Sequence, residues 1–154
     1  MEAEHETCMR EAIAEAKAAF QRGEVPVGAV AVYNGQVIGR GHNRKEEWAD
    51  PTAHAEMIAL REAAQALGSW RLAGVTLYCT MEPCPMCAGA MILARLPRLV
   101  YAVDDPKSGA AGSVVDVVRS PSLNHQVEVT KGVLAEKAKE LLDLFFKGLR
   151  QEAP

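Results

Sequence analysis

The stretch EPCPMC, Glu82 to Cys87, constrains the fold of this chain more than any other segment. Its two cysteines stand three residues apart, so in a helix they lie on the same face. The proline before the first cysteine is typical of the start of a helix. A second stretch, TAHAEM, places His54 and Glu56 at the start of another expected helix, and 26 residues separate Glu56 from Pro83. If both helix starts open at one edge of a sheet, His54, Cys84 and Cys87 converge.

A C-x-x-C pair can be a disulfide, a redox couple, half of a metal site, or two buried side chains. The charged N-terminus resembles no signal segment, and no run approaches eighteen apolar residues, so we expect a cytoplasmic protein without membrane contact. A structural disulfide is disfavoured in that compartment. A redox pair would leave His54 and Glu56 without a role.

One imidazole and two thiolates form a three-ligand zinc site whose fourth position stays open for water, as in catalytic centres. We therefore expect one Zn²⁺ per subunit, held by His54, Cys84 and Cys87. A structural zinc would need a fourth protein ligand; Cys79 is available but is expected in a core strand, and Cys8 has no partner pattern.

The charge of such a centre predicts the role of Glu56. Zinc with two thiolates and a neutral imidazole has a net charge of about zero, so it acidifies its water less than an all-histidine site does. A general base is then needed nearby, and Glu56 lies two residues from a ligand. Pro83 fixes the approach of the chain to the second helix.

The chain of 154 residues is expected to form a single domain spanning 1–154. About half of it is apolar (49%), which is typical of globular proteins. The net charge of −3 excludes binding to a polyanion through bulk charge, so a nucleic-acid partner would require a local basic patch.

Hydrophobic periodicity and turn signals predict alternating strands and helices. Asn34-Gly35 is a strong hairpin signal between two strands, and Asp50 or Thr52 is the expected cap of the helix that stops near Gly68. This order predicts an α/β fold, a three-layer α/β/α sandwich around a mixed five-stranded sheet. Strands are expected at 27–33, 36–42, 75–80, 98–103 and 126–130, and helices at 5–22, 53–67, 84–95, 113–119 and 133–149, with 43–52 as a polar loop.

HAE with PCPMC is the signature of zinc-dependent nucleobase deaminases. From about residue 6 to residue 150 the chain resembles one family among them, the bacterial tRNA-specific adenosine deaminases. The resemblance rests on GEVPVGAV, GHNR, DPTAHAEMIALR, LYCTMEPCPMCAGAMILAR, DDPKSGAAGS and NHQVEVTKGVLAE.

The resemblance implies a cytidine deaminase-like fold and hydrolytic conversion of adenosine to inosine at the wobble position of tRNA anticodons. A zinc-activated water attacks C6 of adenine, and Glu56 moves the proton from water to the ring nitrogen and then to the departing amine. It also implies that the partner is a tRNA anticodon loop and that the protein is a homodimer.

The resemblance further assigns residues that bind the substrate. Asn43 hydrogen-bonds the nucleoside, whereas Val27 and Ala55, with Pro83 beside them, form walls of the base pocket. Residues that contact ribose or phosphate are expected in the glycine-rich loop and among nearby cations: Asp105, Lys107, Ser108, Arg44 and Arg150.

Two other functions stay open on sequence alone. Deaminases of free guanine, cytosine or cytidine share the zinc motifs, and guanine deaminases have a similar DPTAHAE. A zinc-stabilised RNA-binding protein without catalysis is the third possibility, but it would need no acid–base group such as Glu56 beside an open zinc position. The packing around His42, where aromatic residues are also common, is not predicted.

Overall fold

A five-stranded mixed sheet in the order β2-β1-β3-β4-β5 forms the centre of the computed structural model, which describes residues 2–152. The β1–β2 and β1–β3 pairs are antiparallel, whereas β3–β4 and β4–β5 are parallel. The strands are β1 (Gly28–Tyr33), β2 (Gln36–His42), β3 (Val75–Met81), β4 (Arg98–Val103) and β5 (Glu128–Lys131). The helices are α1 (Glu2–Gln21), α2 (Lys45–Trp48), α3 (Ala55–Leu67), α4 (Pro85–Leu93) and α5 (Ala135–Glu152).

The predicted hairpin is confirmed. Asn34 and Gly35 both have positive φ, 50° and 76°, which is the backbone of a two-residue turn that matches the twist of its strands. The turn pairs Tyr33 with Gln36, and after a register shift between Ala31 and Val32 the pairing of β1 with β2 continues to Gly28↔His42. This pairing brings the segment after β2, which begins with Asn43, beside Val27.

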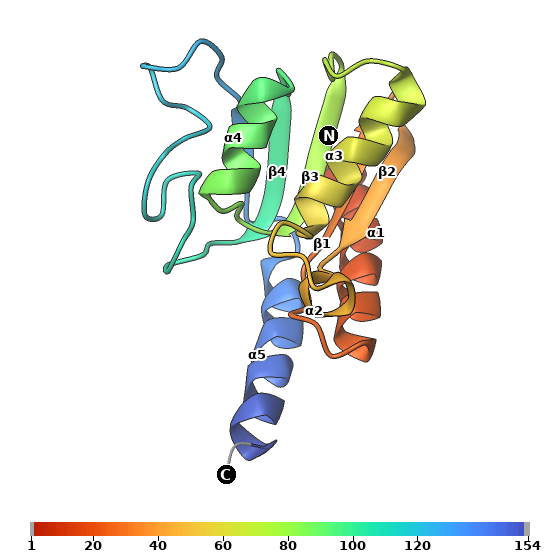
Figure 1. Cartoon of the computed structure of the whole chain (residues 1–154), viewed down its shortest axis with the longest axis vertical. Coiled ribbons are helices and arrows are strands. Elements are labelled where there is room, and N and C mark those ends of the chain that lie inside the picture. The colour runs from red at the N-terminus through yellow and green to blue at the C-terminus, as the bar shows by residue number, and fades with distance from the viewer. Residues whose placement is uncertain (1, 153–154) are drawn as a thin grey trace.

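Side chains that alternate along the strands divide the core into two layers. Ala29 and Ala31 pack in the cluster that includes residues of α3 and α4, whereas Val30 and Val32 pack with residues of α1 and α5. Figure 1 shows α3 and α4 in front of the sheet and α1 behind it. The predicted three-layer α/β/α sandwich is therefore confirmed.

The expected cap of the third helix is wrong. His54, not Asp50 or Thr52, is the N-cap residue of α3, and its side chain makes no capping bond. The Asp50 carboxylate instead accepts hydrogen bonds from the N–H and the hydroxyl of Thr52, at 2.8 and 2.7 Å. That local turn, two residues before the helix, satisfies the side chains that the sequence offered as caps.

Two further local expectations are wrong. The loop expected at 43–52 contains the short helix α2, in which the N–H groups of Glu46 and Glu47 donate to the buried Glu24 carboxylate. The helix expected near 113–119 is absent from the described structure, which has turns and an isolated bridge between Ala111 and Asp116 there. In both places a hydrogen-bond partner distant in the sequence decides the conformation of the backbone.

The chain between β4 and β5, residues 104–127, forms no helix and no named strand (Figure 1). It runs beside α4 on one side of the molecule. The C-terminal helix α5 extends beyond the sheet. None of the helices within 2–152 is both long enough and apolar enough to cross a bilayer.

Helix α1 lies so close to β1 that only glycine fits at position 28. A Cβ placed on Gly28 would stand 2.0 Å from the carbonyl oxygen of Ala12 and 2.5 Å from the N of Ala16. Neither backbone atom can move without shifting the whole helix.

We expect Gly28→Ala to lower the free energy of unfolding by about 3 kcal/mol, because overpacking against backbone cannot relax cheaply. Gly148→Ala in α5, where the added Cβ meets nothing within 4 Å, is the matched control and should raise stability by about 0.5–1 kcal/mol. Urea denaturation of both variants measures the difference; equal stabilities would contradict the close contact.

Candidate metal centre and active site

The two predicted half-motifs converge at one end of the sheet. His54 is the N-cap of α3 and Cys84 is the N-cap of α4, both in extended conformations with φ of −82° and −75°. Cys87 lies one turn into α4 and is fully buried. These helix starts adjoin the carboxyl ends of the parallel strands β3 and β4, where ligands of open α/β sheets commonly bind.

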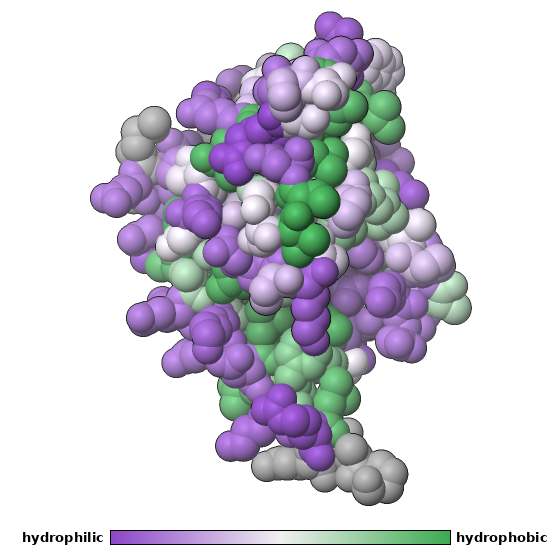
Figure 2. All heavy atoms as spheres, turned by 90° about the vertical axis from the view of Figure 1, so that its left-hand side faces the viewer, coloured by the Kyte–Doolittle hydropathy of each residue, from purple (hydrophilic) through white to green (hydrophobic). Residues whose placement is uncertain are grey.

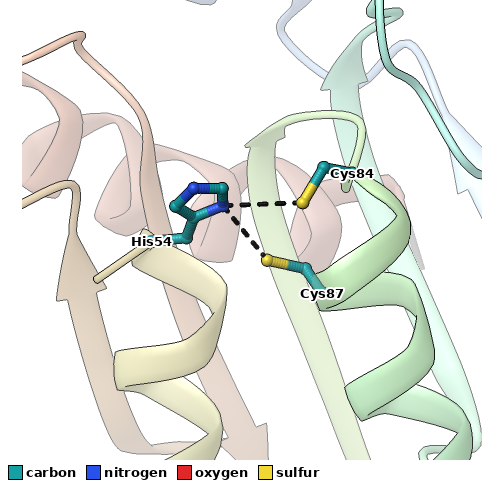
Figure 3. Close-up of side chains that lie close together, drawn as sticks. All are labelled: His54, Cys84 and Cys87. Carbon is teal, nitrogen blue, oxygen red and sulfur yellow. Dashed lines mark hydrogen bonds between the residues drawn. The ribbon is translucent and has the colours of Figure 1, made fainter. Parts of the chain in front are cut away.

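His54, Cys84 and Cys87 form a group of metal-ligating atoms (Figure 3). His54 Nδ1 lies 3.6 Å from Cys84 Sγ and 3.4 Å from Cys87 Sγ. Ligands at tetrahedral zinc distances from one ion would be about 3.6 Å apart, so the donor set and its spacing fit Zn²⁺. The cysteines are free, and the group contains no fourth protein ligand among residues 2–152.

The two thiols differ in how readily they ionise. A hydrogen bond from Cys87 lowers the pKa of Cys84 to about 4 despite burial, and His54 adds to this effect. The same bond and burial raise the pKa of Cys87. The pKa of His54 is raised by its hydrogen bond with Cys84. A bound metal takes both sulfurs as thiolates, so loading the site releases protons.

Glu56 lies in the first turn of α3, is 4% exposed, and stands outside the group of metal-ligating atoms. Burial raises its pKa to about 7. A carboxyl group whose pKa lies near the working pH can both accept and return a proton. The position and the protonation behaviour of Glu56 therefore suit general acid–base chemistry beside the group formed by His54, Cys84 and Cys87.

A pocket of about 1140 Å³ opens from this centre. It extends past the ends of β3 and β4 to the face of α5, where Leu142 and Phe146 line it. Most of the residues predicted for the site lie on its wall: Val27, Asn43, His54, Ala55, Glu56, Cys84, Asp105, Lys107 and Ser108.

Four of the predicted site residues lie elsewhere. Cys87 is fully buried and does not line the pocket. Pro83 does not line it either, and its carbonyl oxygen accepts the N–H of Ala110 at 2.8 Å. Arg44 pairs with Glu47 at 2.8 Å and covers the Trp48 ring. Arg150 lines a smaller hollow of about 400 Å³ next to the pocket, which it shares with Lys107.

The side-chain oxygen of Asn43 already has a hydrogen-bond partner within the protein. Its Oδ1 accepts the N–H of Lys45 at 3.1 Å, and its own N–H donates to Val27 O. This leaves Nδ2 to donate to a ligand. Asp105 is also engaged, since its carboxylate accepts hydrogen bonds from Lys107 N and from both N and Oγ of Ser108.

Several residues of the site were missed by sequence reasoning. Glu24 and Glu82 are both 2% exposed carboxylates that accept backbone hydrogen bonds from segments beside the pocket. A glutamate at the end of an apolar strand, as Glu82 is, was the available signal. No sequence signal indicated that α5 lines the pocket. The spacing of its apolar residues predicts an amphipathic helix but not which part of the molecule that helix faces.

The family model described as MafB19-like deaminase matches residues 3–150. Among curated proteins, the tRNA-specific adenosine deaminase of Bacillus subtilis is 50% identical over 147 residues, covering 96% of this chain and 91% of its own. That of Aquifex aeolicus is 46% identical and covers 92% of this chain and 93% of its own.

Solved structures that resemble the chain include both a tRNA deaminase and a deaminase of a free base. One from a study of A-to-I editing by tRNA:A34 deaminases at the wobble position of transfer RNA has a TM-score of 0.85 and 46% identity, covering 88% of this chain and 99% of its own. A guanine deaminase from Nitrosomonas europaea has a TM-score of 0.75 and 26% identity, covering 91% and 83%.

Proposed function

The chain belongs to the MafB19-like deaminases and, within them, to the tRNA-specific adenosine deaminases, and from this premise we propose that it converts adenosine to inosine at the wobble position of tRNA anticodons. The observation that carries the proposal is the meeting of His54 Nδ1 with both sulfurs beside a buried Glu56. The reaction is hydrolytic: water adds its oxygen at C6, and the amino group leaves as ammonia.

His54, Cys84 and Cys87 would hold the metal. When bound there, zinc supplies a Lewis acid that lowers the pKa of water. Glu56 would accept one proton of that water and deliver it to the adenine ring nitrogen. It would then carry the second proton, from the hydroxyl formed at C6, to the departing amine. Burial, which holds its pKa near 7, allows the carboxyl to play both parts at neutral pH.

The pocket wall would hold the base in place. Val27 and Ala55 offer an apolar surface to a purine, and Nδ2 of Asn43 can donate to the nucleoside. A base inside this pocket is separated from its neighbours, so it must leave its stack. That costs least in a single-stranded loop such as an anticodon loop.

The pocket is larger than a free base requires. Small-molecule pockets span about 300–1,000 Å³, and this one continues from the metal ligands to α5. Two cations on its wall, Lys45 and Lys107, have no acidic partner among the described residues, whereas Lys131 and Lys139 pair with Asp104 and Asp143. These features favour an RNA loop, with Lys107 and Arg150 as contacts to phosphate.

We also propose a homodimer in the cytoplasm, where a tRNA substrate is found. Figure 2 looks onto the side that carries residues 104–127 and shows hydrophobic residues in a band among hydrophilic ones. Exposed apolar residues on α4 and on this segment include Leu93, 73% exposed, with Val114, Val115 and Leu123. Contiguous exposed apolar surface favours association. Sedimentation equilibrium at twice the chain mass is expected, and a monomer would contradict it.

The zinc-loaded protein should be incubated with an anticodon stem-loop carrying adenosine at the wobble position, and in parallel with free guanine, adenosine and cytidine. Nucleoside mass spectrometry should find inosine in the stem-loop alone, read as G on sequencing. A stem-loop with adenosine one position away is the matched control. Turnover of a free base without inosine in RNA would replace the proposal by the small-molecule alternative.

A further inference from the structure

Glu82 is a buried charge that the proposed chemistry does not use. It stands between the end of β3 and Pro83, two residues before the ligand Cys84, and is 2% exposed. No cation pairs with it among residues 2–152. A carboxylate removed from water needs hydrogen bonds to compensate for its lost hydration, so its partners indicate what it does.

Within residues 2–152, every hydrogen-bond donor to the Glu82 carboxylate comes from one segment, residues 105–113. Oε1 accepts the N–H of Asp105 at 2.9 Å and also the hydroxyl of Ser113. Oε2 accepts the N–H of Ala111 at 2.9 Å and that of Ser113 at 3.1 Å. Three of these donors are backbone N–H groups, so both carboxylate oxygens act as acceptors, the role that an ionised carboxylate fills.

The backbone around Glu82 is joined both to the end of β4 and to the same segment. The N–H of Glu82 donates to Val103 O at 2.9 Å, and the N–H of Ala110 donates to Pro83 O at 2.8 Å. Gly109 passes so close that a Cβ there would lie 2.4 Å from Glu82 Cδ. The start of the metal-ligand helix and the loop are therefore packed as one unit.

This loop supplies a wall of the pocket. Asp105, Lys107 and Ser108 line the pocket that contains Glu56, and the loop has no helix or named strand to hold its shape. Four hydrogen bonds to one buried carboxylate replace that regular structure. Since Glu82 is covalently linked to the metal-ligand segment, it fixes the loop relative to the metal.

We propose that Glu82 is a positioning residue that holds residues 105–113 against the start of α4 and so sets the affinity for the RNA substrate. The assignment rests on the proposed function. It predicts that Glu82 acts on binding of the stem-loop and leaves the chemical step, which belongs to Glu56 and the metal ligands, largely unchanged.

Glu82→Gln tests this, because an amide NH₂ would face donors where the carboxylate has an acceptor. The variant should keep stoichiometric zinc, with KM for the anticodon stem-loop raised about tenfold or more and kcat changed less than about threefold. Amide hydrogen exchange at Ala111 and Ser113 should become at least about tenfold faster, while β3 and β4 stay protected.

Glu24→Gln is the matched control for exchange. Glu24 is an equally buried glutamate, but it accepts the N–H groups of Glu46 and Glu47, at 3.1 and 2.8 Å. Its replacement should release those two amides and leave Ala111 and Ser113 protected. If Glu82→Gln and Glu24→Gln release the same amides, the specific hold on the loop is overturned.

Ser113→Ala decides the matter should Glu82→Gln fail to fold. It removes one hydroxyl from an exposed residue and should raise KM about threefold and speed exchange at Ala111. Wild-type KM together with wild-type exchange would overturn the proposal. A wild-type protein that forms no inosine in the stem-loop refutes the proposed function instead, and exchange at Ala111 and Ser113 alone then decides whether Glu82 holds the loop.

Discussion

Glu56→Ala is expected to keep a full complement of zinc and to lose deamination by about 10²- to 10⁴-fold, the usual contribution of a positioned acid–base group. The carboxylate is buried beside the metal ligands but is not one of the three. Removing it therefore takes away the proton carrier and leaves the metal's donor set intact. Zinc content by plasma mass spectrometry and single-turnover inosine formation measure the two properties separately.

Glu62→Ala is the control for this change. Glu62 lies on the same helix, is exposed, and accepts a hydrogen bond from the N–H of Arg40 rather than facing the pocket. The control variant should retain zinc and most activity. Full activity in Glu56→Ala would refute the proton-transfer role, and loss of its zinc would indicate that Glu56 is a ligand.

Cys87→Ser is expected to lose more than about nine-tenths of its zinc on dialysis against a chelator, and its activity with it. Zinc prefers thiolate, whereas a serine hydroxyl keeps its proton at neutral pH. The group of ligating atoms holds only three residues within 2–152, so no neighbour can replace the lost sulfur. Cys84→Ser should behave alike.

Cys8→Ser tests whether a cysteine-to-serine substitution away from the candidate metal centre changes the zinc content. Cys8 is buried on α1, on the other face of the sheet, and packs in the layer formed with α5. The control should keep stoichiometric zinc. A Cys84→Ser or Cys87→Ser protein that holds one zinc per chain would exclude that residue as a ligand.

Sequence reasoning succeeded where neighbours in the chain decide the outcome. Asn34-Gly35 was enough to predict the hairpin, because the turn needs only two residues that accept positive φ. Ala12, Ala16 and Ala19 share a helical face by spacing alone, and all three are buried. The spacing of Cys84 and Cys87 predicted that their sulfurs lie close together, and both belong to one group of metal-ligating atoms.

Sequence reasoning failed where a distant partner supplies the hydrogen bond. The helix expected near 113–119 was wrong because the Ser113 backbone donates to Glu82, 31 residues away. The short helix α2 was missed because Glu24, more than twenty residues before it, accepts the N–H groups of Glu46 and Glu47. Neither contact leaves a periodic pattern in the sequence.

The sequence by itself determined the strands, most of the helices and the kinds of side chain available to hold a metal. These depend on side-chain spacing and turn chemistry within a few residues. Only the tertiary structure decided that His54 Nδ1 would lie 3.6 and 3.4 Å from two sulfurs that are 30 and 33 residues away in the sequence, and that α5 would line the pocket. The sheet order and the packing of helices on each face set such distances. They arise from burial of apolar surface by the whole chain, which no single segment encodes.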